Sequence, residues 1–219
     1  MCGSEAAQVH ERVLWPQLIA EWELSVSEAE SVDRREGQRC PACGVGLRSA
    51  ALAVSILRHA GWPGTLDAWT SSDTPLSVLE INQAGQLSPW LARLRHHQLV
   101  EYPATDMQHL ASADGSWDLV VHSDTVEHVE DPVRALAECR RVLAPQGAVC
   151  FTIPVIPSRL TRRRDHLPPS FHGTESDPSY LVHTEYGADF WAQVFDSGFT
   201  TLCIDALQWP DAIALTAMA

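Results

Sequence analysis

Short apolar runs alternate with stretches of helical periodicity from Leu76 onward. This alternation is the signature of βαβ units and a parallel sheet. The final two apolar runs, 199–206 and 212–217, are joined by a connection too short for a parallel crossover, so they should pair antiparallel. We therefore predict a doubly wound, mostly parallel α/β sheet that ends in an antiparallel hairpin. The other predicted strands are 76–81, 98–102, 117–122 and 148–154, and the predicted helices are 87–94, 132–143 and 185–196.

The N-terminal third has a different pattern, which predicts an accessory helical segment. Apolar residues recur at helical spacing over 13–30, and an Ala/Leu-rich run over 47–59 predicts a second helix that glycines and a proline terminate. Residues 70–75 have the composition of a linker. The predicted domains are therefore an N-terminal extension over 1–70, containing a CxxC turn, and a main domain over 71–219.

One long stretch, 154–183, has no clear periodicity and contains five prolines together with Gly173. Such a loop in a compact domain is usually functional or mobile, so we predict that about 155–183 forms a lid over the substrate. The loop also carries the basic cluster of the chain, for which we favour a solvated loop over contact with an anionic substrate group. The cluster comprises Arg159, Arg162, Arg163 and Arg164.

Charge and composition exclude several classes of partner. The chain has 219 residues with 45% apolar and 20% charged positions, as in ordinary globular proteins, and a formal net charge of −13. This charge would repel phosphate backbones and anionic lipid, so we expect no nucleic-acid or membrane partner. No apolar stretch approaches the length of a bilayer span, and the start of the chain lacks the order of a signal peptide. We expect a cytoplasmic protein, and its eight tryptophans leave room for an apolar partner surface, such as that of a homodimer.

Two cysteines, Cys40 and Cys43, have the spacing of a metal knuckle, and Gly44 follows them. A structural zinc site needs four ligands, and no second CxxC is present. Cys2, His172 or His183 could complete a zinc site. The alternative, which we favour, is a capped turn of two buried free thiols, since all six cysteines are scattered and no disulfide framework is evident.

The segment after the first predicted strand is a candidate cofactor loop. Glu80 stands at the strand end, and small or turn-forming residues follow it before a predicted helix: Asn82, Ala84 and Gly85. In a doubly wound sheet a nucleotide-like ligand lies at such a point, where strand ends and helix N-termini converge. One glycine alone is a weak signal, and an ordinary strand-to-helix turn is the alternative.

The segments 114–132 (DGSWDLVVHSDTVEHVEDP) and 140–147 (RRVLAPQG) give stronger support. Together they resemble the class I S-adenosylmethionine-dependent methyltransferase superfamily, in which the equivalent region commonly has an acidic-glycine turn, an FDLV strand, an LEHV-DP turn, a helix and an LKPGG turn. The resemblance covers roughly 76–217, including the terminal hairpin. It implies S-adenosylmethionine as cofactor and a Rossmann-like sheet.

The resemblance also implies roles for individual residues. Glu80 matches the acidic strand end that anchors the loop below the methionine moiety, and Asn82, Ala84 and Gly85 match the glycine-rich loop, although only Gly85 is a glycine. Glu101 resembles the acidic residue that accepts hydrogen bonds from both ribose hydroxyls. Asp106 and Met107 resemble the pair that binds adenine. The interval between Glu101 and Asp106 is short, so one helix and one strand of the common pattern should be missing. Glu101 as a surface charge and Asp106 as the N-cap of a helix over 107–110 are the alternatives.

Histidines are the candidate groups on the acceptor side. His122, Ser123 and Asp124 follow a strand at its C-terminal end, where donor and acceptor should meet, and His122 could take the proton of the acceptor. A hydrogen-bonded structural role is its alternative. His172 and His183 belong to the predicted lid, and loops over a rigid scaffold usually determine substrate choice. His183 could instead lie at the start of a helix, and for His128, in the EHV turn, we favour a structural role.

The sequence thus predicts S-adenosylmethionine-dependent methyl transfer to a small-molecule acceptor through an O, N or C atom. The competing hypothesis is a methyltransferase-like scaffold without catalysis, which the glycine-poor loop would favour. Nicotinamide-dependent reduction is a third hypothesis, but it expects a fuller glycine fingerprint than this chain has.

Overall fold

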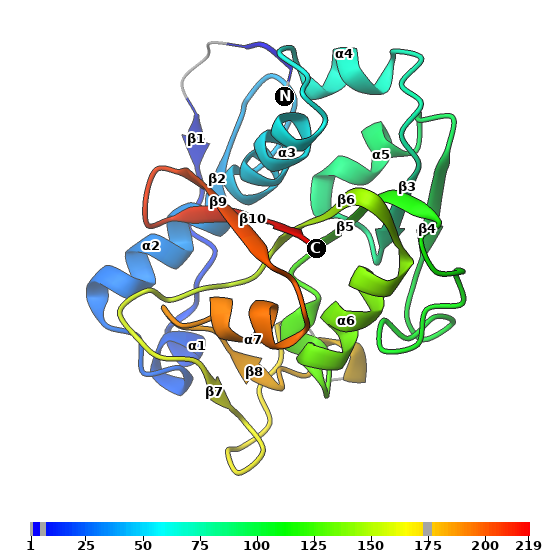
Figure 1. Cartoon of the computed structure of the whole chain (residues 1–219). Helices are drawn as coiled ribbons and strands as arrows, with labels where there is room; N and C mark the ends of the chain where they lie inside the picture. Colours follow the sequence, from blue (N-terminus) through cyan, green and yellow to red (C-terminus); the bar gives the residue numbers. More distant parts are fainter. Residues whose placement is uncertain (1, 5–7, 173–176) are drawn as a thin grey trace.

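A six-stranded mixed sheet forms the centre of the computed structural model, which describes residues 2–4, 8–172 and 177–219 (Figure 1). Its strand order is β4-β3-β5-β6-β10-β9, and the first four of these strands run parallel. β10 pairs antiparallel with both β6 and β9, which confirms the predicted α/β sheet with an antiparallel C-terminal hairpin. The strands are β3 (Val78–Ile81), β4 (His97–Val100), β5 (Trp117–Ser123), β6 (Leu143–Thr152), β9 (Thr201–Leu207) and β10 (Ala212–Met218).

The stretch between β4 and β5 lacks the helix and the strand that the sequence predicts to be missing. Residues 101–116 form only turns and bends, and no strand lies outside β4 among the described residues. The missing helix and strand leave β4 as an edge of the sheet. Its last residues, together with Glu101, therefore lie open beside the end of β3.

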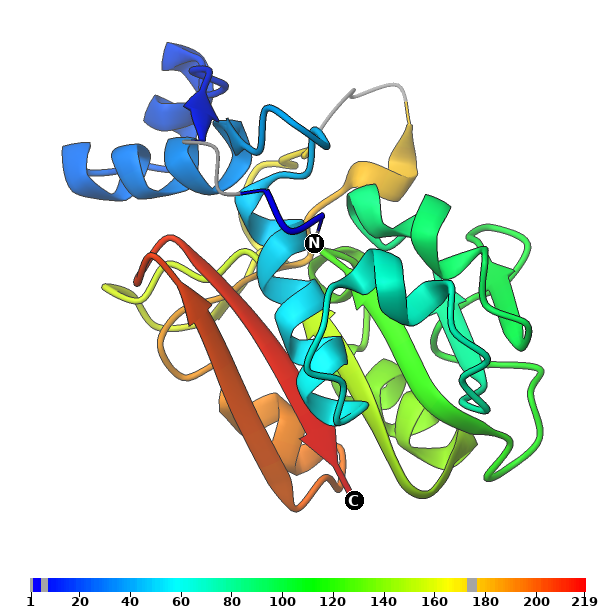
Figure 2. The same ribbon diagram turned by 90° about the horizontal axis from the view of Figure 1, so that it is seen from above.

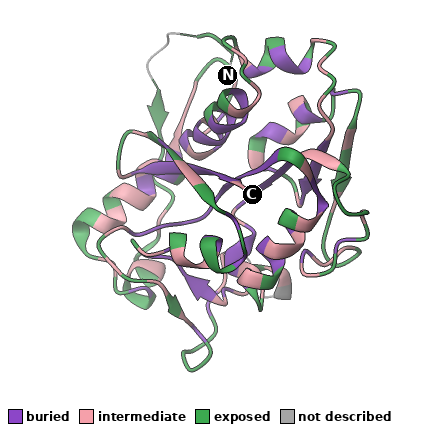
Figure 3. Ribbon diagram, in the orientation of Figure 1, coloured by how far each residue is buried: buried purple, intermediate pink, exposed green. Residues whose placement is uncertain are grey.

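Helices cover both faces of the sheet (Figure 2). On one face, α3 (Leu47–His59) lies across β6, β9 and β10, and α4 (Leu66–Thr70) and α5 (Ser88–Leu91) extend the same apolar cluster. On the other face, α6 (Pro132–Val142) and α7 (Trp191–Asp196) pack in a second cluster. Alternate residues of each strand enter the two clusters because successive side chains point to opposite faces. Figure 3 shows the buried residues concentrated along the central strands and α3.

The N-terminal region corrects one predicted helix. The run 13–30 is two helices, α1 (Pro16–Glu21) and α2 (Val26–Gly37), separated at Glu23, which has a φ of 50°. Ser25 starts α2, because its hydroxyl accepts from the backbone N–H of Glu28 while the Glu28 carboxylate accepts from the N–H of Ser25. This capping box fixes a helix start where the apolar periodicity continues without a break. A short pair, β1 (Val9–His10) with β2 (Gln38–Arg39), precedes α3.

The predicted lid is largely irregular, as expected, but its basic cluster is paired with carboxylates and one of its arginines is buried. Arg159 pairs with Glu28, and Arg162 and Arg164 pair with Glu185. Arg164 is only 7% exposed, which contradicts the solvated loop that the charge run predicted. The short elements in this region are β7 (Arg162–Arg163), η3 (Pro178–Tyr180) and β8 (Thr184–Glu185), and 173–176, with Gly173, lie outside the described residues.

The helix predicted over 185–196 begins only at Trp191. Thr184 and Glu185 instead pair with β7, and the backbone of Gly187 packs against Arg159. A Cβ at Gly187 would lie 2.3 Å from the carbonyl oxygen of Arg159, so this close approach requires glycine. These contacts tie residues 159–163 of the loop to residues 184–187.

Two further elements follow strand ends and position the site. η1 (Gly85–Leu87) and α5 together replace the single helix predicted over 87–94, and η2 (Val126–His128) follows β5. None of the helices in the described parts of the chain is long and apolar enough to cross a bilayer.

Candidate active site

A cavity of about 610 Å³ lies where β3, β4 and β5 end. The turn 105–108, η2 and the loop around Tyr180 close its other sides. This is the position in a doubly wound sheet where strand ends leave a crevice for ligands. Six of the predicted site residues line the cavity: Asn82, Glu101, Asp106, Met107, Ser123 and His183.

Glu80 anchors the loop after β3 rather than lining the cavity. Its side chain is fully buried, and its carboxylate accepts from the N–H of Ala84 at 2.7 Å, from the hydroxyl of Ser88, and from His97 Nε2 at 2.7 Å. Burial opposes ionisation, but these hydrogen bonds hold the pKa of Glu80 below its usual value. Ala84 is likewise buried, so both residues act on the cavity through the shape of the loop.

The loop itself depends on two residues with left-handed backbone. Asn82 has a φ of 48°, a conformation that asparagine tolerates better than most residues, and its side-chain oxygen accepts from the N–H of Tyr102 at 2.9 Å. Gly85 has a φ of 55°, and a Cβ there would lie 2.9 Å from the hydroxyl of Ser49. Gly85 therefore lets the chain pass close to α3, while Asn82 ties the ends of β3 and β4 together.

The adenine-side candidates lie together on the cavity wall. Glu101 is exposed and accepts from the side-chain amide of Gln83 at 3.2 Å. Asp106 accepts from the backbone N–H of Gln108 at 2.9 Å, and Met107 is 4% exposed. The segment 107–110 is not helical, so the alternative in which Asp106 caps a helix is wrong. Its carboxylate instead stabilises a turn that presents Met107.

The structure corrects the predicted position of His122. Successive residues of β5 point to opposite faces, so the neighbouring Ser123 lines the cavity and His122 does not. The His122 ring is fully buried, stacks on Phe151 at 4.8 Å between ring centroids, and has no hydrogen-bond partner at either nitrogen. Burial lowers the pKa of His122 to about 3, which keeps the ring neutral. It forms no hydrogen bond, so its hydrogen-bonded structural alternative is not observed either.

The two lid histidines differ in position. His183 lines the cavity, and its backbone N–H donates to the carbonyl of Glu127 at 2.8 Å. Burial lowers its pKa, so its imidazole is neutral near pH 7. His172 does not line the cavity. It lies 5.0 Å from Trp22 between ring centroids, and Trp22 donates to Ser170 at 2.8 Å, so the extension and the lid meet here.

A group of partly exposed charges, whose pairing sequence reasoning missed, lies beside the cavity. Asp124, which lines the cavity, has a φ of 44° and accepts from Arg48 and from the hydroxyl of Thr152 at 2.8 Å. Burial opposes ionisation of Asp124, but the nearby arginines hold its pKa below its usual value. Arg48 also pairs with Glu36 at 3.1 Å. The position of Asp124 at a strand end follows from the sequence, but its pairing with Arg48 does not, because only the packing of α3 brings Arg48 to the end of β5.

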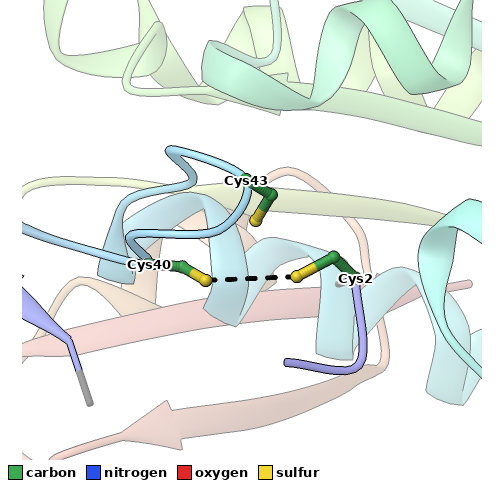
Figure 4. Close-up of side chains that lie close together, drawn as sticks. All are labelled: Cys2, Cys40 and Cys43. Carbon is green, nitrogen blue, oxygen red and sulfur yellow. Dashed lines mark hydrogen bonds between the residues drawn. The ribbon is translucent and has the colours of Figure 1, made fainter. Parts of the chain in front are cut away.

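Three thiols converge at the start of α3 (Figure 4). The sulfurs of Cys2 and Cys40 are 4.0 Å apart, and Cys43 lies beside them in the turn. All three thiols are free, and neither Cys40 nor Cys43 is fully buried, which corrects the turn of two buried thiols. Backbone N–H groups of Cys43 and Ala42 lower the pKa of Cys40 to about 7, while burial raises that of Cys43 to about 11.

Comparison with known proteins gives a consistent result. Ubiquinone biosynthesis O-methyltransferases of Cereibacter sphaeroides strains match 55 to 67 residues at 38–39% identity, over 25–29% of this chain. The chain thus matches only about a quarter of the length of these relatives, 22–27%.

Solved structures with a similar fold are more distant. They include an S-adenosylmethionine-dependent methyltransferase from Thermotoga maritima (16% identity, TM-score 0.43, 78% of this chain and 91% of that one). An arsenic(III) S-adenosylmethionine methyltransferase from Chlamydomonas reinhardtii has 18% identity and a TM-score of 0.42, over 77% and 71% of the two chains.

A family model described as a methyltransferase domain matches residues 41–151, which is half of the chain and spans α3 to β6. The match includes the loop after β3, the cavity wall around Asp106, and the EHV turn. The chain belongs to the methyltransferase domain family, within the S-adenosylmethionine-dependent class I superfamily that its sequence resembles.

Proposed function

We propose that this chain transfers a methyl group from S-adenosylmethionine to a small-molecule acceptor. The observation that carries the proposal is the cavity at the ends of β3, β4 and β5, which is lined by four of the residues implied by the family resemblance: Asn82, Glu101, Asp106 and Met107. Its volume of about 610 Å³ falls within the usual range of small-molecule sites. The buried anchor at Glu80 adds support, because an ordinary turn has no need of a fully buried carboxylate with three hydrogen bonds.

The residues present fit the donor. Glu101 presents a carboxylate that can accept hydrogen bonds from two ribose hydroxyls, and Asp106 can accept from the adenine amino group beside the thioether of Met107. The loop from Asn82 to Gly85 would take the methionine end. S-adenosylmethionine supplies an already activated methyl group on a sulfonium, so the protein has mainly to hold an acceptor in line and close to it.

The acceptor side of the cavity is formed by η2 and by the lid loop. Ser123, His128 and His183 line this part of the cavity together with Tyr180. His183 is neutral near pH 7, so its imidazole can accept a proton from the acceptor as the methyl group transfers. We therefore propose that His183, and not His122, accepts the proton that the methyl acceptor loses.

A small molecule is the favoured class of acceptor. The net charge of −13 disfavours nucleic acid, and the arginines of the lid are paired with carboxylates. The matched relatives are named as O-methyltransferases, so a hydroxyl acceptor is the first to test. Apart from the glycine-poor loop, no feature of the described residues favours the non-catalytic scaffold, and none favours a nicotinamide cofactor.

Incubation with methyl-labelled S-adenosylmethionine and a panel of hydroxylated, amino and thiol small molecules tests this proposal. Label should enter a small-molecule product, and His183→Gln should lower kcat while S-adenosylhomocysteine affinity is kept. His96→Gln is the matched control, because His96 is exposed and lies outside the cavity lining. Label found only in protein or RNA fractions would contradict the small-molecule assignment.

We also propose zinc at Cys2, Cys40 and Cys43. Three sulfurs within reach of one ion supply three of the four ligands of a tetrahedral site. Among the described residues, the cluster contains no histidine. His172 and His183 are therefore not proposed as ligands of this zinc ion. Zinc analysis of purified protein should include one equivalent that Cys40→Ser removes, whereas zinc lost completely on mild dialysis would contradict the site. The homodimer, the cytoplasmic location and the domain boundary near residue 70 stay predictions.

A further inference from the structure

The side chain of Glu127 is fully buried, and neither of its carboxylate oxygens has a hydrogen-bond partner. A buried carboxylate without partners is costly, so its surroundings need an explanation. Two histidine nitrogens lie near Glu127 Oε1, His128 Nε2 at 3.6 Å and His172 Nδ1 at 3.8 Å. Both distances are too long for hydrogen bonds.

These distances suit atoms that share a metal ion. Bonds of about 2.1 Å from a tetrahedral metal place its ligand atoms about 3.4 Å apart. One ligand atom from each of Glu127, His128 and His172 lies within 4.8 Å of the others. Glu127 and His128 come from η2, while His172 comes from the lid loop, so the three converge from distant parts of the sequence.

The orientation of His128 is that of a metal ligand. Its Nδ1 donates to the carbonyl of Leu181 at 2.9 Å, which leaves the lone pair on Nε2, the nitrogen that faces Glu127. Metal-binding histidines usually donate their second nitrogen in this way, and the donation fixes tautomer and ring orientation. Burial lowers the pKa of His128 and that of His172, the latter to about 3, so both rings are neutral and can act as ligands.

Charge balance around Glu127 leaves room for a cation. Two arginines are near it, but Arg48 pairs with Asp124 and Glu36, and Arg35 pairs with Glu36. Three carboxylates therefore face two guanidinium groups. Burial, followed by the charge of Asp124, raises the pKa of Glu127, which an additional positive charge would reverse.

We propose that Glu127, His128 and His172 bind a divalent first-row transition-metal ion. Imidazole nitrogen with one carboxylate is a donor set that such ions accept, and three protein ligands leave at least one coordination position open. His128 lines the cavity, so the ion would lie at the acceptor end of the site. If methyl transfer occurs as proposed, an oxygen of the acceptor can occupy the open position, which would favour its ionised form.

Cobalt titration of the chelator-treated full chain tests the site. The visible spectrum of Co²⁺ separates this site from the three cysteines, because thiolate ligation gives an intense charge-transfer band that nitrogen and oxygen ligation lacks. Besides the ion held by the three cysteines, which gives that band, the parent should bind one Co²⁺ that does not give it. Glu127→Gln and His172→Asn should each weaken this binding at least about tenfold, since even outer-shell changes cost that much. His96→Gln should leave it unchanged.

Cobalt spectra that contain only the thiolate band would overturn the proposal, as would equal cobalt affinity in the parent and both variants. Such a result would mean that the three groups share a proton on Glu127 instead. Thermal unfolding without metal checks that each variant is folded, and His172→Asn decides the question if Glu127→Gln does not fold. Because cobalt binding is read directly, failure here leaves the proposed methyl transfer untouched.

Discussion

The hydrogen bonds of Glu80 allow a quantitative prediction. Glu80→Ala removes a fully buried carboxylate and leaves the N–H of Ala84, the hydroxyl of Ser88 and Nε2 of His97 without their partner. Removing one member of a buried charged pair costs about 3–5 kcal/mol. Since Ser88 and His97 are only partly buried and can recover water, we expect the lower end, a loss of about 3 kcal/mol in the free energy of unfolding.

Urea denaturation of parent and variant measures this loss, with Glu21→Ala as an exposed control that should change by less than about 0.5 kcal/mol. The pH dependence has a fixed sign. Because the folded-state pKa of Glu80 is depressed, its contribution is present above the unfolded pKa and is lost as the pH falls through the folded value. A loss below about 1 kcal/mol, or a loss that persists unchanged at acid pH, would refute the role of Glu80 as an anchor.

Two further predictions concern the loop and the buried histidine. Gly85→Ala should lower the free energy of unfolding by at least about 1 kcal/mol, as measured by thermal unfolding. The new methyl group would be crowded by the hydroxyl of Ser49 at a residue whose φ is positive. Gly115→Ala should cost less, because Gly115 also has a positive φ but the nearest atom to its new methyl group would be 3.8 Å away. Equal losses at both glycines would argue against the crowding. His122→Phe should keep S-adenosylhomocysteine affinity, since His122 lies outside the cavity lining and has no hydrogen bond to lose. The same variant should lessen the loss of stability below pH 6.5, because a buried histidine with a pKa of about 3 favours unfolding as the pH falls. If urea denaturation showed the same loss of stability below pH 6.5 in the parent and in His122→Phe, that pKa would be contradicted.

The sequence pattern predicts the sheet well because its signals are local and strong. The strands 117–122 and 148–154 and the terminal hairpin follow from apolar runs and a short connection. β5, β9 and β10 lie close to these predictions, while β6 (Leu143–Thr152) overlaps its prediction but begins earlier. The helix over 13–30 failed because the Ser25 and Glu28 capping box outweighs continuous periodicity. The helix over 185–196 failed because residues near its start are held by long-range contacts with Arg159 and β7.

The site was predictable only in part, for the same reason. Residues at strand ends, such as Asn82 and Glu101, follow from the order of the elements, and they do line the cavity. The position of His122 could not be decided from its strand alone, because one residue of register exchanges the two faces of the sheet. Glu127, Arg48 and His172 meet through contacts between residues far apart in sequence, which no periodicity records.

Calorimetric titration of the full chain with S-adenosylhomocysteine tests whether the cavity binds the methyl donor. We expect one site of micromolar affinity, weakened at least tenfold, or about 1.4 kcal/mol, in Glu101→Ala and in Asp106→Ala. Asp73→Ala, an exposed carboxylate outside the cavity lining, should bind like the parent. No binding by a folded parent, or equal affinity in all four proteins, would contradict the assignment of this cavity to the methyl donor.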